Sequence, residues 1–250
     1  MEFSICIESV FRGMNPLDAL EKVKECGFRA FEFWGWKNKD MEALFKKAAS
    51  LSLTCTAFCT SAFILNDPAK RNDYLEGLKE SVAAARKAGC GFLISQAGLD
   101  TGAVRSFQHK SVVAGLKAAA SILEGSGVTL LLEPLNGRVD HVGTYLESSD
   151  EGFQILNEVG CENIKLLFDI YHQQITEGDI IRRIQANLKN IAHFHSAGSP
   201  GRNELYSGEL NYRKVFETIK SLGYKGFFGL EYFPKDDPVE GLKRIRDSLI

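Results

Sequence analysis

Short apolar runs and amphipathic stretches alternate along nearly the whole chain. The apolar runs have the length of β-strands, and we expect strands over residues 3–8, 29–34, 53–58, 91–96, 128–133, 164–169, 190–195 and 226–232. Between them, stretches such as 15–27, 72–89 and 211–223 place apolar residues at i, i+3, i+4 and i+7, which is the spacing of a helix that buries one face. The pattern therefore predicts a strand–helix unit repeated about eight times.

Glycine and proline mark the ends of the predicted helices. Gly89, Gly160 and Gly223 each follow the last apolar position of a helical stretch, where a residue with a left-handed backbone often ends the helix. Pro16 and Pro238 stand where a first helical turn would begin, because proline lacks an amide hydrogen that would be unpaired there anyway. These signals place the helix boundaries independently of the apolar spacing.

Alternating strands and helices form either a closed (β/α)8 barrel or an open, doubly wound sheet. A dinucleotide-binding sheet would carry a G-x-G-x-x-G motif after its first strand, whereas this chain reads FRGMNP at 11–16. The length of 250 residues suits one barrel, and no linker or low-complexity segment interrupts the chain. We therefore expect an α/β fold, a (β/α)8 TIM barrel that forms a single domain over residues 1–250.

Composition and charge narrow the range of partners and compartments. An apolar fraction of 44% supports a large core, and a net charge of −2 provides no basic face for nucleic acid or an anionic membrane. The N-terminus lacks the basic segment of a signal peptide, and no apolar run is long enough to span a bilayer. The six cysteines form no C-x-x-C pair and lie in or beside apolar runs. We expect reduced, buried thiols and a cytoplasmic protein with no nucleic-acid or membrane partner.

One polar residue ends each of the last four predicted strands. These residues are Glu133, Asp169, His195 and Glu231, separated by intervals of 36, 26 and 36 positions. The C-terminal ends of barrel strands surround the mouth of one cavity, so the three carboxylates and the imidazole should converge there. Oxygen-rich ligation with one nitrogen suits Mg²⁺, Mn²⁺ or Co²⁺ at least as well as Zn²⁺. The sequence therefore predicts one divalent metal ion, with two glutamates that could also move protons.

Each of these residues taken alone has an ordinary structural interpretation. Glu133 could face solvent at a strand end, Asp169 could cap a helix, and His195 could be a packed core residue. Their occurrence on four consecutive predicted strands favours the metal site.

Further polar residues are expected near the same cavity. His172 follows Asp169 by three positions and would lie on the same side if a helical turn begins there. His193 shares a strand face with His195 and should sit one layer deeper, as a neighbour or as a packed side chain.

Glu32 ends the second predicted strand, and we favour a structural role for it, with Lys165 as a possible buried partner. Gly229 shares the inward face of Glu231 and should leave space near the barrel axis. Five aromatic residues after the second and third strands could either form an apolar wall that excludes water or belong to ordinary packing: Phe33, Trp34, Trp36, Phe58 and Phe63.

Several motifs resemble the hydroxypyruvate isomerase family, which lies within the wider group of xylose-isomerase-like barrels. They are LLEPLN at 131–136, FDIYHQQ at 168–174, HFHSAGSPGRNELYSGELNY at 193–212 and GFFGLEYFP at 226–234. The family often has Pro-Gly-Thr-Gly-Glu where this chain reads Leu-Tyr-Ser-Gly-Glu at 205–209. Some hydroxypyruvate isomerases also carry Gln where this chain has a histidine, at His195. These departures concern the substrate more than the metal chemistry.

The resemblance implies a (β/α)8 barrel with one divalent metal ion. The metal ligands that it implies are Glu133, Asp169, His195 and Glu231. It also implies that Glu133 and Glu231 are the catalytic acid/base pair, and that His172 and Arg202 bind the substrate. Barrels of this group often form dimers or tetramers, so a homo-oligomer is possible.

The reaction that the resemblance implies is aldose–ketose isomerisation through an enediol, converting hydroxypyruvate to tartronate semialdehyde (2-hydroxy-3-oxopropanoate). The alternatives are a ketose 3-epimerase or a 2-oxo-tetronate isomerase acting on a longer sugar or sugar acid, and a non-catalytic sugar-acid binding protein. An endonuclease IV-like enzyme would need more metal ligands and a basic DNA face, whereas this chain has five histidines and a weakly acidic balance. A small keto acid or sugar is therefore the expected partner.

Overall fold

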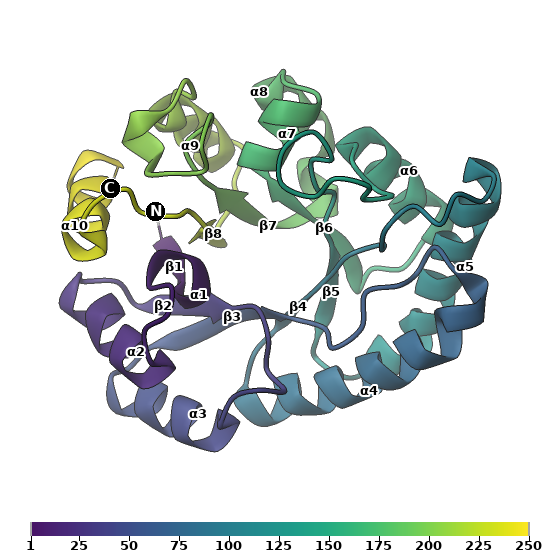
Figure 1. The fold of residues 1–250 in the computed structure, drawn as a ribbon, viewed down its shortest axis with the longest axis horizontal. Coiled ribbons are helices and arrows are strands. Elements are labelled where there is room, and N and C mark those ends of the chain that lie inside the picture. Colours follow the sequence, from purple (N-terminus) through teal and green to yellow (C-terminus); the bar gives the residue numbers. More distant parts are fainter. Residues whose placement is uncertain (1, 250) are drawn as a thin grey trace.

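The eight parallel strands close into a barrel in which each strand pairs with its neighbours in the sequence, and β1 pairs with β8 (Figure 1). The computed structural model describes residues 2–249. The strands are β1 (Glu2–Cys6), β2 (Ala30–Phe33), β3 (Thr54–Cys59), β4 (Phe92–Ser95), β5 (Thr129–Leu132), β6 (Ile164–Asp169), β7 (Ile191–Ser196) and β8 (Phe227–Leu230). The predicted (β/α)8 barrel is thus confirmed, and the open sheet is excluded.

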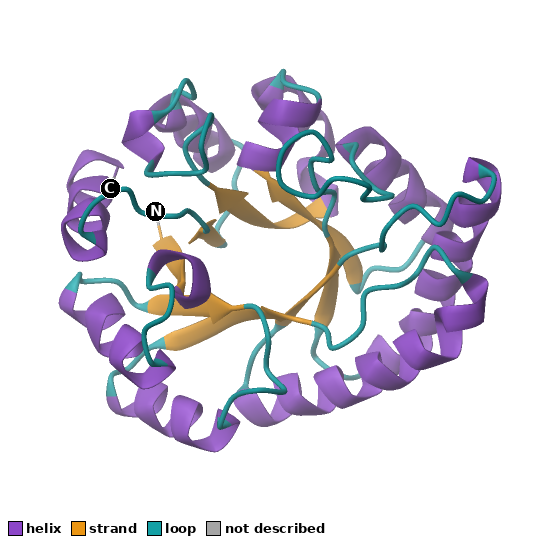
Figure 2. Cartoon of the chain, in the orientation of Figure 1, coloured by secondary structure: helices purple, strands orange, loops and turns teal. Residues whose placement is uncertain are grey.

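Helices form an outer ring around the strands (Figure 2). The α-helices are α1 (Ile7–Val10), α2 (Pro16–Glu25), α3 (Met41–Ser50), α4 (Arg71–Ala88), α5 (Arg105–Leu123), α6 (Ser149–Val159), α7 (Ile170–Thr176), α8 (Ile180–Asn187), α9 (Tyr212–Ser221) and α10 (Pro238–Leu249). Three short 3₁₀ helices are η1 (Pro68–Lys70), η2 (Leu188–Asn190) and η3 (Leu205–Ser207). None of the helices within residues 2–249 has the length and apolar character needed to cross a membrane.

Local sequence signals set the helix boundaries. Pro16 begins α2, and the Asn15 side chain caps it by accepting a hydrogen bond of 2.9 Å from the Leu17 amide. Gly89 and Gly160 end α4 and α6 with φ angles of 64° and 66°. Glycine suits these positions because it adopts a left-handed backbone without a steric penalty.

The main core lies between the strands and the surrounding helices. Phe216 of α9 illustrates it, because its ring centroid lies 4.7 Å from that of Phe228 and 5.4 Å from that of Phe3. A second, smaller apolar cluster has the inward strand parity of the site residues and fills the barrel interior: Ala57, Cys59, Ile94, Leu131 and Leu167. This inner cluster supports the polar layer above it.

All six cysteines are free thiols, as predicted. Five of them are buried, and Cys161 is half-buried. Cys55 and Cys90 lie closest to each other among the recorded contacts, with 3.8 Å between their sulfur atoms. Burial raises the pKa of the Cys59 thiol well above its ordinary value, so this thiol is protonated and a poor nucleophile.

The aromatic core makes a stability prediction. Phe216→Ala should lower the free energy of unfolding by about 3–5 kcal/mol, because it leaves a cavity where the ring is fully buried. Phe107→Ala is the matched control, since that ring is 53% exposed and its loss should change stability by less than about 0.5 kcal/mol. Urea unfolding followed by circular dichroism measures both. Equal losses in the two variants would contradict this description of the core.

Candidate metal centre and active site

A cavity of about 550 Å³ opens at the C-terminal ends of the strands. Its polar lining includes Glu133, His195, Arg202 and Glu231. Its apolar lining includes Trp34, Trp36 and Phe63. The cavity therefore combines a charged group of residues with an aromatic wall, as a site for a small polar ligand requires.

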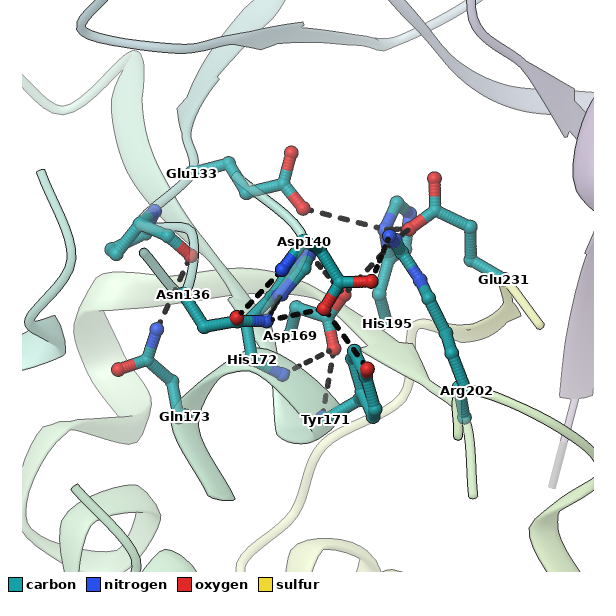
Figure 3. A network of polar contacts seen from close by, with 12 residues as sticks. Glu133, Asn136, Asp140, Asp169, Tyr171, His172, Gln173, His195, Arg202 and Glu231 are labelled. Carbon is teal, nitrogen blue, oxygen red and sulfur yellow. Dashed lines mark hydrogen bonds and ion pairs between the residues drawn. The ribbon is translucent and has the colours of Figure 1, made fainter. Parts of the chain in front are cut away.

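Three members of the predicted quartet, Glu133, His195 and Glu231, line this cavity, and Asp169 lies in the same network of polar contacts (Figure 3). Glu133, Asp169, His172 and Glu231 each offer one ligand atom, and these atoms all lie within 4.8 Å of one another. His195 joins them from β7, since its Nδ1 lies 3.3 Å from Glu231 Oε2 and 3.7 Å from Glu133 Oε1. The structure thus brings together residues that lie far apart in the sequence: Glu133 and Glu231 are separated by 98 positions.

The strand ends place these side chains in slightly different ways. Glu133 and Glu231 come one residue after β5 and β8, whereas Asp169 is the last residue of β6. Asp169 also caps α7, because its Oδ1 accepts hydrogen bonds from the Tyr171 amide at 2.8 Å and the His172 amide at 3.3 Å. Its other oxygen, Oδ2, faces the site. Asp169 is therefore a helix N-cap, and its second carboxylate oxygen remains available to the site.

Glu231 is the most strongly compensated carboxylate of the site. Its Oε1 accepts a hydrogen bond from Trp34 Nε1 at 2.5 Å, and its Oε2 accepts one from Arg202 Nη2 at 2.6 Å. Burial alone would raise the pKa of Glu231, but the Arg202 guanidinium and then His195 hold that pKa well below its ordinary value. Glu231 is consequently ionised at neutral pH.

Glu133 and Asp169 respond to burial in the opposite direction. Burial raises the pKa of Glu133, and it raises the pKa of Asp169 to about 6. The nearby Glu231 adds to both shifts, because like charges disfavour further ionisation. Negative charge is therefore crowded at this point, and a bound cation would relieve it.

His172 is held in one tautomer by Asn136. The Asn136 Oδ1 accepts hydrogen bonds from the Val139 and Asp140 amides, so its amide nitrogen donates to His172 Nδ1, 2.6 Å away. Burial, assisted by Arg202, lowers the pKa of His172 well below its ordinary value. The neutral ring therefore carries its proton on Nε2, the nitrogen that lies 3.5 Å from Asp169 Oδ2. In this tautomer His172 is a hydrogen-bond donor to the site and has no lone pair there for a metal ion.

His195 has the opposite arrangement. Its Nδ1 faces Glu133 and Glu231, and it has no hydrogen-bond partner among residues 2–249. Burial opposes charging of this ring, but Glu32 and then Glu231 outweigh it and raise the pKa of His195 well above its ordinary value. Three buried carboxylates and this unpartnered nitrogen fit a single divalent cation that prefers oxygen ligands.

Arg202 reaches the site from the loop after β7. It is 8% exposed, and its guanidinium carbon lies 5.4 Å from the centroid of the Tyr171 ring and 5.6 Å from that of Phe233. Besides Glu231, its nitrogens approach Asp169 and Asp140 to 3.9 Å. Arg202 thus partly offsets the charge of the carboxylates, and it lines the cavity.

One expectation near the site needs correction, and another holds. Lys165 is not the partner of Glu32: its Nζ donates to the Lys189 carbonyl at 3.4 Å, whereas Glu32 contacts His193 at 2.9 Å. The side chain of Lys165 leaves the barrel because burial of its unpaired charge would be costly. His193, in contrast, sits one layer below His195, as predicted.

The aromatic group divides between wall and core. Trp34, Trp36 and Phe63 line the cavity, whereas Phe33 and Phe58 stack in the core with centroids 5.1 Å apart. The hydrogen bond from Trp34 to Glu231 was not anticipated. The parity of β2 could have indicated it, because positions 32 and 34 face the same side of the strand.

Comparison with known proteins agrees with this architecture. The profile of the xylose isomerase-like TIM barrel family matches residues 20–249. The chain belongs to this family. Hydroxypyruvate isomerase of Escherichia coli (strain K12) is 30% identical over 97% of each chain, which places the chain among the hydroxypyruvate isomerase-like isomerases.

Two further similarities refine the comparison. A 2-oxo-tetronate isomerase of Cupriavidus necator is 42% identical over 134 residues, which are 54% of this chain and 51% of the relative. A crystal structure described as AP endonuclease, family 2 from Brucella melitensis superposes with a TM-score of 0.94 at 24% identity, covering 100% of this chain and 99% of that one. At that identity the superposition establishes the fold alone.

The pKa of Asp169 makes a prediction for the metal-free protein. Its value of about 6 lies above the ordinary 3.8, so ionisation costs the folded state free energy that the unfolded chain does not lose. Asp169→Asn removes this cost and keeps the helix cap. The variant should therefore gain stability relative to wild type as the pH rises from about 4 to about 6, by about 2–3 kcal/mol in total.

Urea unfolding in the presence of a chelator, repeated across this pH range, measures the difference between the two proteins. A difference that stays constant with pH would mean that Asp169 titrates like a solvent-exposed carboxylate.

Proposed function

We propose that the chain is a metal-dependent aldose–ketose isomerase that interconverts hydroxypyruvate and tartronate semialdehyde through an enediol. The observation that carries this proposal is the position of two glutamates with opposite pKa shifts, Glu133 and Glu231, against the same nitrogen of His195. The relationship to hydroxypyruvate isomerases over nearly the full chain supports it.

The proposed metal ligands are Glu133, Asp169, His195 and Glu231. A divalent ion held there, whether Mg²⁺, Mn²⁺, Co²⁺ or Zn²⁺, would supply positive charge that polarises the substrate carbonyl and acidifies the adjacent carbon. The donor set is rich in oxygen, which favours the harder ions among these.

The two glutamates are the proposed proton carriers. One removes a proton from the hydroxyl-bearing carbon, and the other delivers a proton to the former carbonyl carbon. The hydroxyl proton passes to the former carbonyl oxygen. The ketone thereby becomes a secondary alcohol, and the primary alcohol becomes an aldehyde. In the metal-free site the pKa of Glu231 is lowered and that of Glu133 is raised, so the two carboxylates are not equivalent and can take different roles.

Arg202 and His172 are the proposed substrate-binding residues. The guanidinium of Arg202 can bind a substrate carboxylate through two parallel hydrogen bonds. The Nε2 proton of His172 can be donated to a substrate oxygen, because Asn136 occupies the other ring nitrogen. The aromatic side chains of Trp34, Trp36 and Phe63 would exclude water from the reacting carbons.

A longer substrate is the second candidate, and the cavity size favours it. A three-carbon keto acid occupies only about 100–200 Å³ when each heavy atom takes up to a water molecule's share of about 30 Å³. The cavity of about 550 Å³ therefore has room for a 2-oxo-tetronate or a free ketose. The partial similarity to a 2-oxo-tetronate isomerase agrees with this alternative.

A substrate panel separates these candidates. The protein is stripped of metal, reloaded separately with Mg²⁺, Mn²⁺, Co²⁺ or Zn²⁺, and supplied with hydroxypyruvate, 2-oxo-tetronate or free ketoses. The highest kcat/KM on hydroxypyruvate supports the first proposal. The highest value on 2-oxo-tetronate or on a ketose supports the second, and equal turnover with and without metal would contradict both.

The acid/base assignment predicts the effect of two isosteric changes. Glu133→Gln and Glu231→Gln should each lower kcat on the preferred substrate by at least about 10²–10⁴-fold, since the amide cannot carry the proton. Glu158→Gln is the matched control, because that side chain is 41% exposed on α6 and should leave kcat unchanged. Steady-state kinetics at equal metal content separates lost proton transfer from lost metal. Wild-type kcat in either site variant would refute its role.

A further inference from the structure

Glu32 is a fully buried carboxylate beneath the proposed metal centre. It is 1% exposed, and it comes from β2 on the side of the barrel opposite to β6 in strand order. A buried carboxylate is stable only when charged or polar groups surround it. Its partners therefore indicate what it does.

The two oxygens of Glu32 serve different partners. Oε2 lies 2.9 Å from His193 Nε2 and 3.1 Å from Thr56 Oγ1. Oε1 lies 3.3 Å from His195 Nε2, and no hydrogen bond occupies it within residues 2–249. One oxygen is thus anchored to the barrel interior, and the other is left for His195.

The backbone leaves room for this contact at one position. A Cβ atom on Gly229 would overlap Glu32 Oε1 and would lie 2.5 Å from His195 Cδ2. The space that the sequence predicted at this glycine is therefore filled by the carboxylate and the imidazole themselves. Any larger residue would separate them or displace them.

We propose that Glu32 is a positioning residue that holds the Nε2 side of the His195 ring and thereby aims Nδ1 at Glu133 and Glu231, where Nδ1 gives up its proton when a cation binds. This inference rests on the proposed metal-dependent function. Carboxylates that accept the second N–H of a metal-bound imidazole orient the ring and strengthen its binding. Without this contact the ring would be free to turn, and Nδ1 would no longer face the two glutamates.

Zinc binding tests this role without any assay of turnover. Zn²⁺ is titrated into metal-free wild type and into Glu32→Gln, with affinity measured by chelator competition and the His195 nitrogens followed by ¹⁵N NMR. Glutamine keeps the shape but has one carbonyl oxygen, which cannot accept from both histidines. Glu32→Gln should lower zinc affinity about 10–100-fold. In the zinc-bound variant, the single set of His195 signals with zinc on Nδ1 and a proton on Nε2 should be lost.

Two further variants make the result specific. Gly229→Ala changes no polar group, yet it should weaken zinc binding and disturb the same NMR signals by separating Glu32 from His195. Ser4→Ala is the matched control: Ser4 is fully buried in the same interior and bonds Thr56 at 2.6 Å, but it makes no recorded contact with either histidine. It should keep the affinity and the His195 signals of wild type.

The outcomes distinguish the two proposals. If zinc leaves the His195 signals of wild type unchanged, both the metal centre and the positioning role are wrong. If zinc shifts these signals in wild type and both Glu32→Gln and Gly229→Ala retain wild-type affinity and protonation, only the role of Glu32 is wrong. Should Glu32→Gln fail to fold by circular dichroism, Gly229→Ala decides alone. An equal loss of affinity in Ser4→Ala would also overturn the role of Glu32.

Discussion

The crowding of buried carboxylates at the C-terminal end of the barrel is the constraint on which the site depends. Glu133, Asp169 and Glu231 are at most 5% exposed and share one small region. Removing an ionised carboxylate from water costs several kcal/mol, so each must be neutralised, hydrogen-bonded or paired. Arg202 and His195 supply the positive charge that the structure places nearest to them. A metal ion would complete this compensation, which explains why the same residues fit a cation and reactive protons.

The negative charges of Glu133 and Glu231 are compensated to different extents. Glu231 accepts hydrogen bonds from Trp34 and Arg202, whereas the recorded contact of the Glu133 carboxylate is with His195 alone at 3.7 Å. Their pKa values consequently shift in opposite directions. Pairs of titratable groups with divergent pKa values are the usual arrangement for acid and base roles. Two glutamates that differ in this way suit a two-base transfer between the two carbons, which is the proposed reaction.

A second polar layer supports the first. Glu32 holds its pKa at about 2 because His195 and His193 outweigh the effect of burial. It lies between these histidines and Thr56, directly below the ring that faces the carboxylates. The apolar cluster around Leu131 and Leu167 shares the barrel interior with this layer. The carboxylate and the two imidazoles offset one another's charge, and this electrostatic pairing restricts the geometry of His195.

Local sequence determined the strands and helices of this protein, whereas the tertiary structure decided which buried polar side chains contact one another. Strand and helix follow from apolar spacing and from terminal residues such as Pro16 and Gly160, because these act over a few neighbouring positions. The four strand ends were also predictable, since barrel closure brings all C-terminal ends to one mouth. The pairing of Glu32 with His193 was not, because it joins positions 161 residues apart across the barrel. Strand parity also allowed Lys165 as a partner of Glu32. In the structure the register of β6 shifts between Leu166 and Leu167, and the partly exposed Lys165 donates to the Lys189 carbonyl, which no local pattern in the sequence indicates.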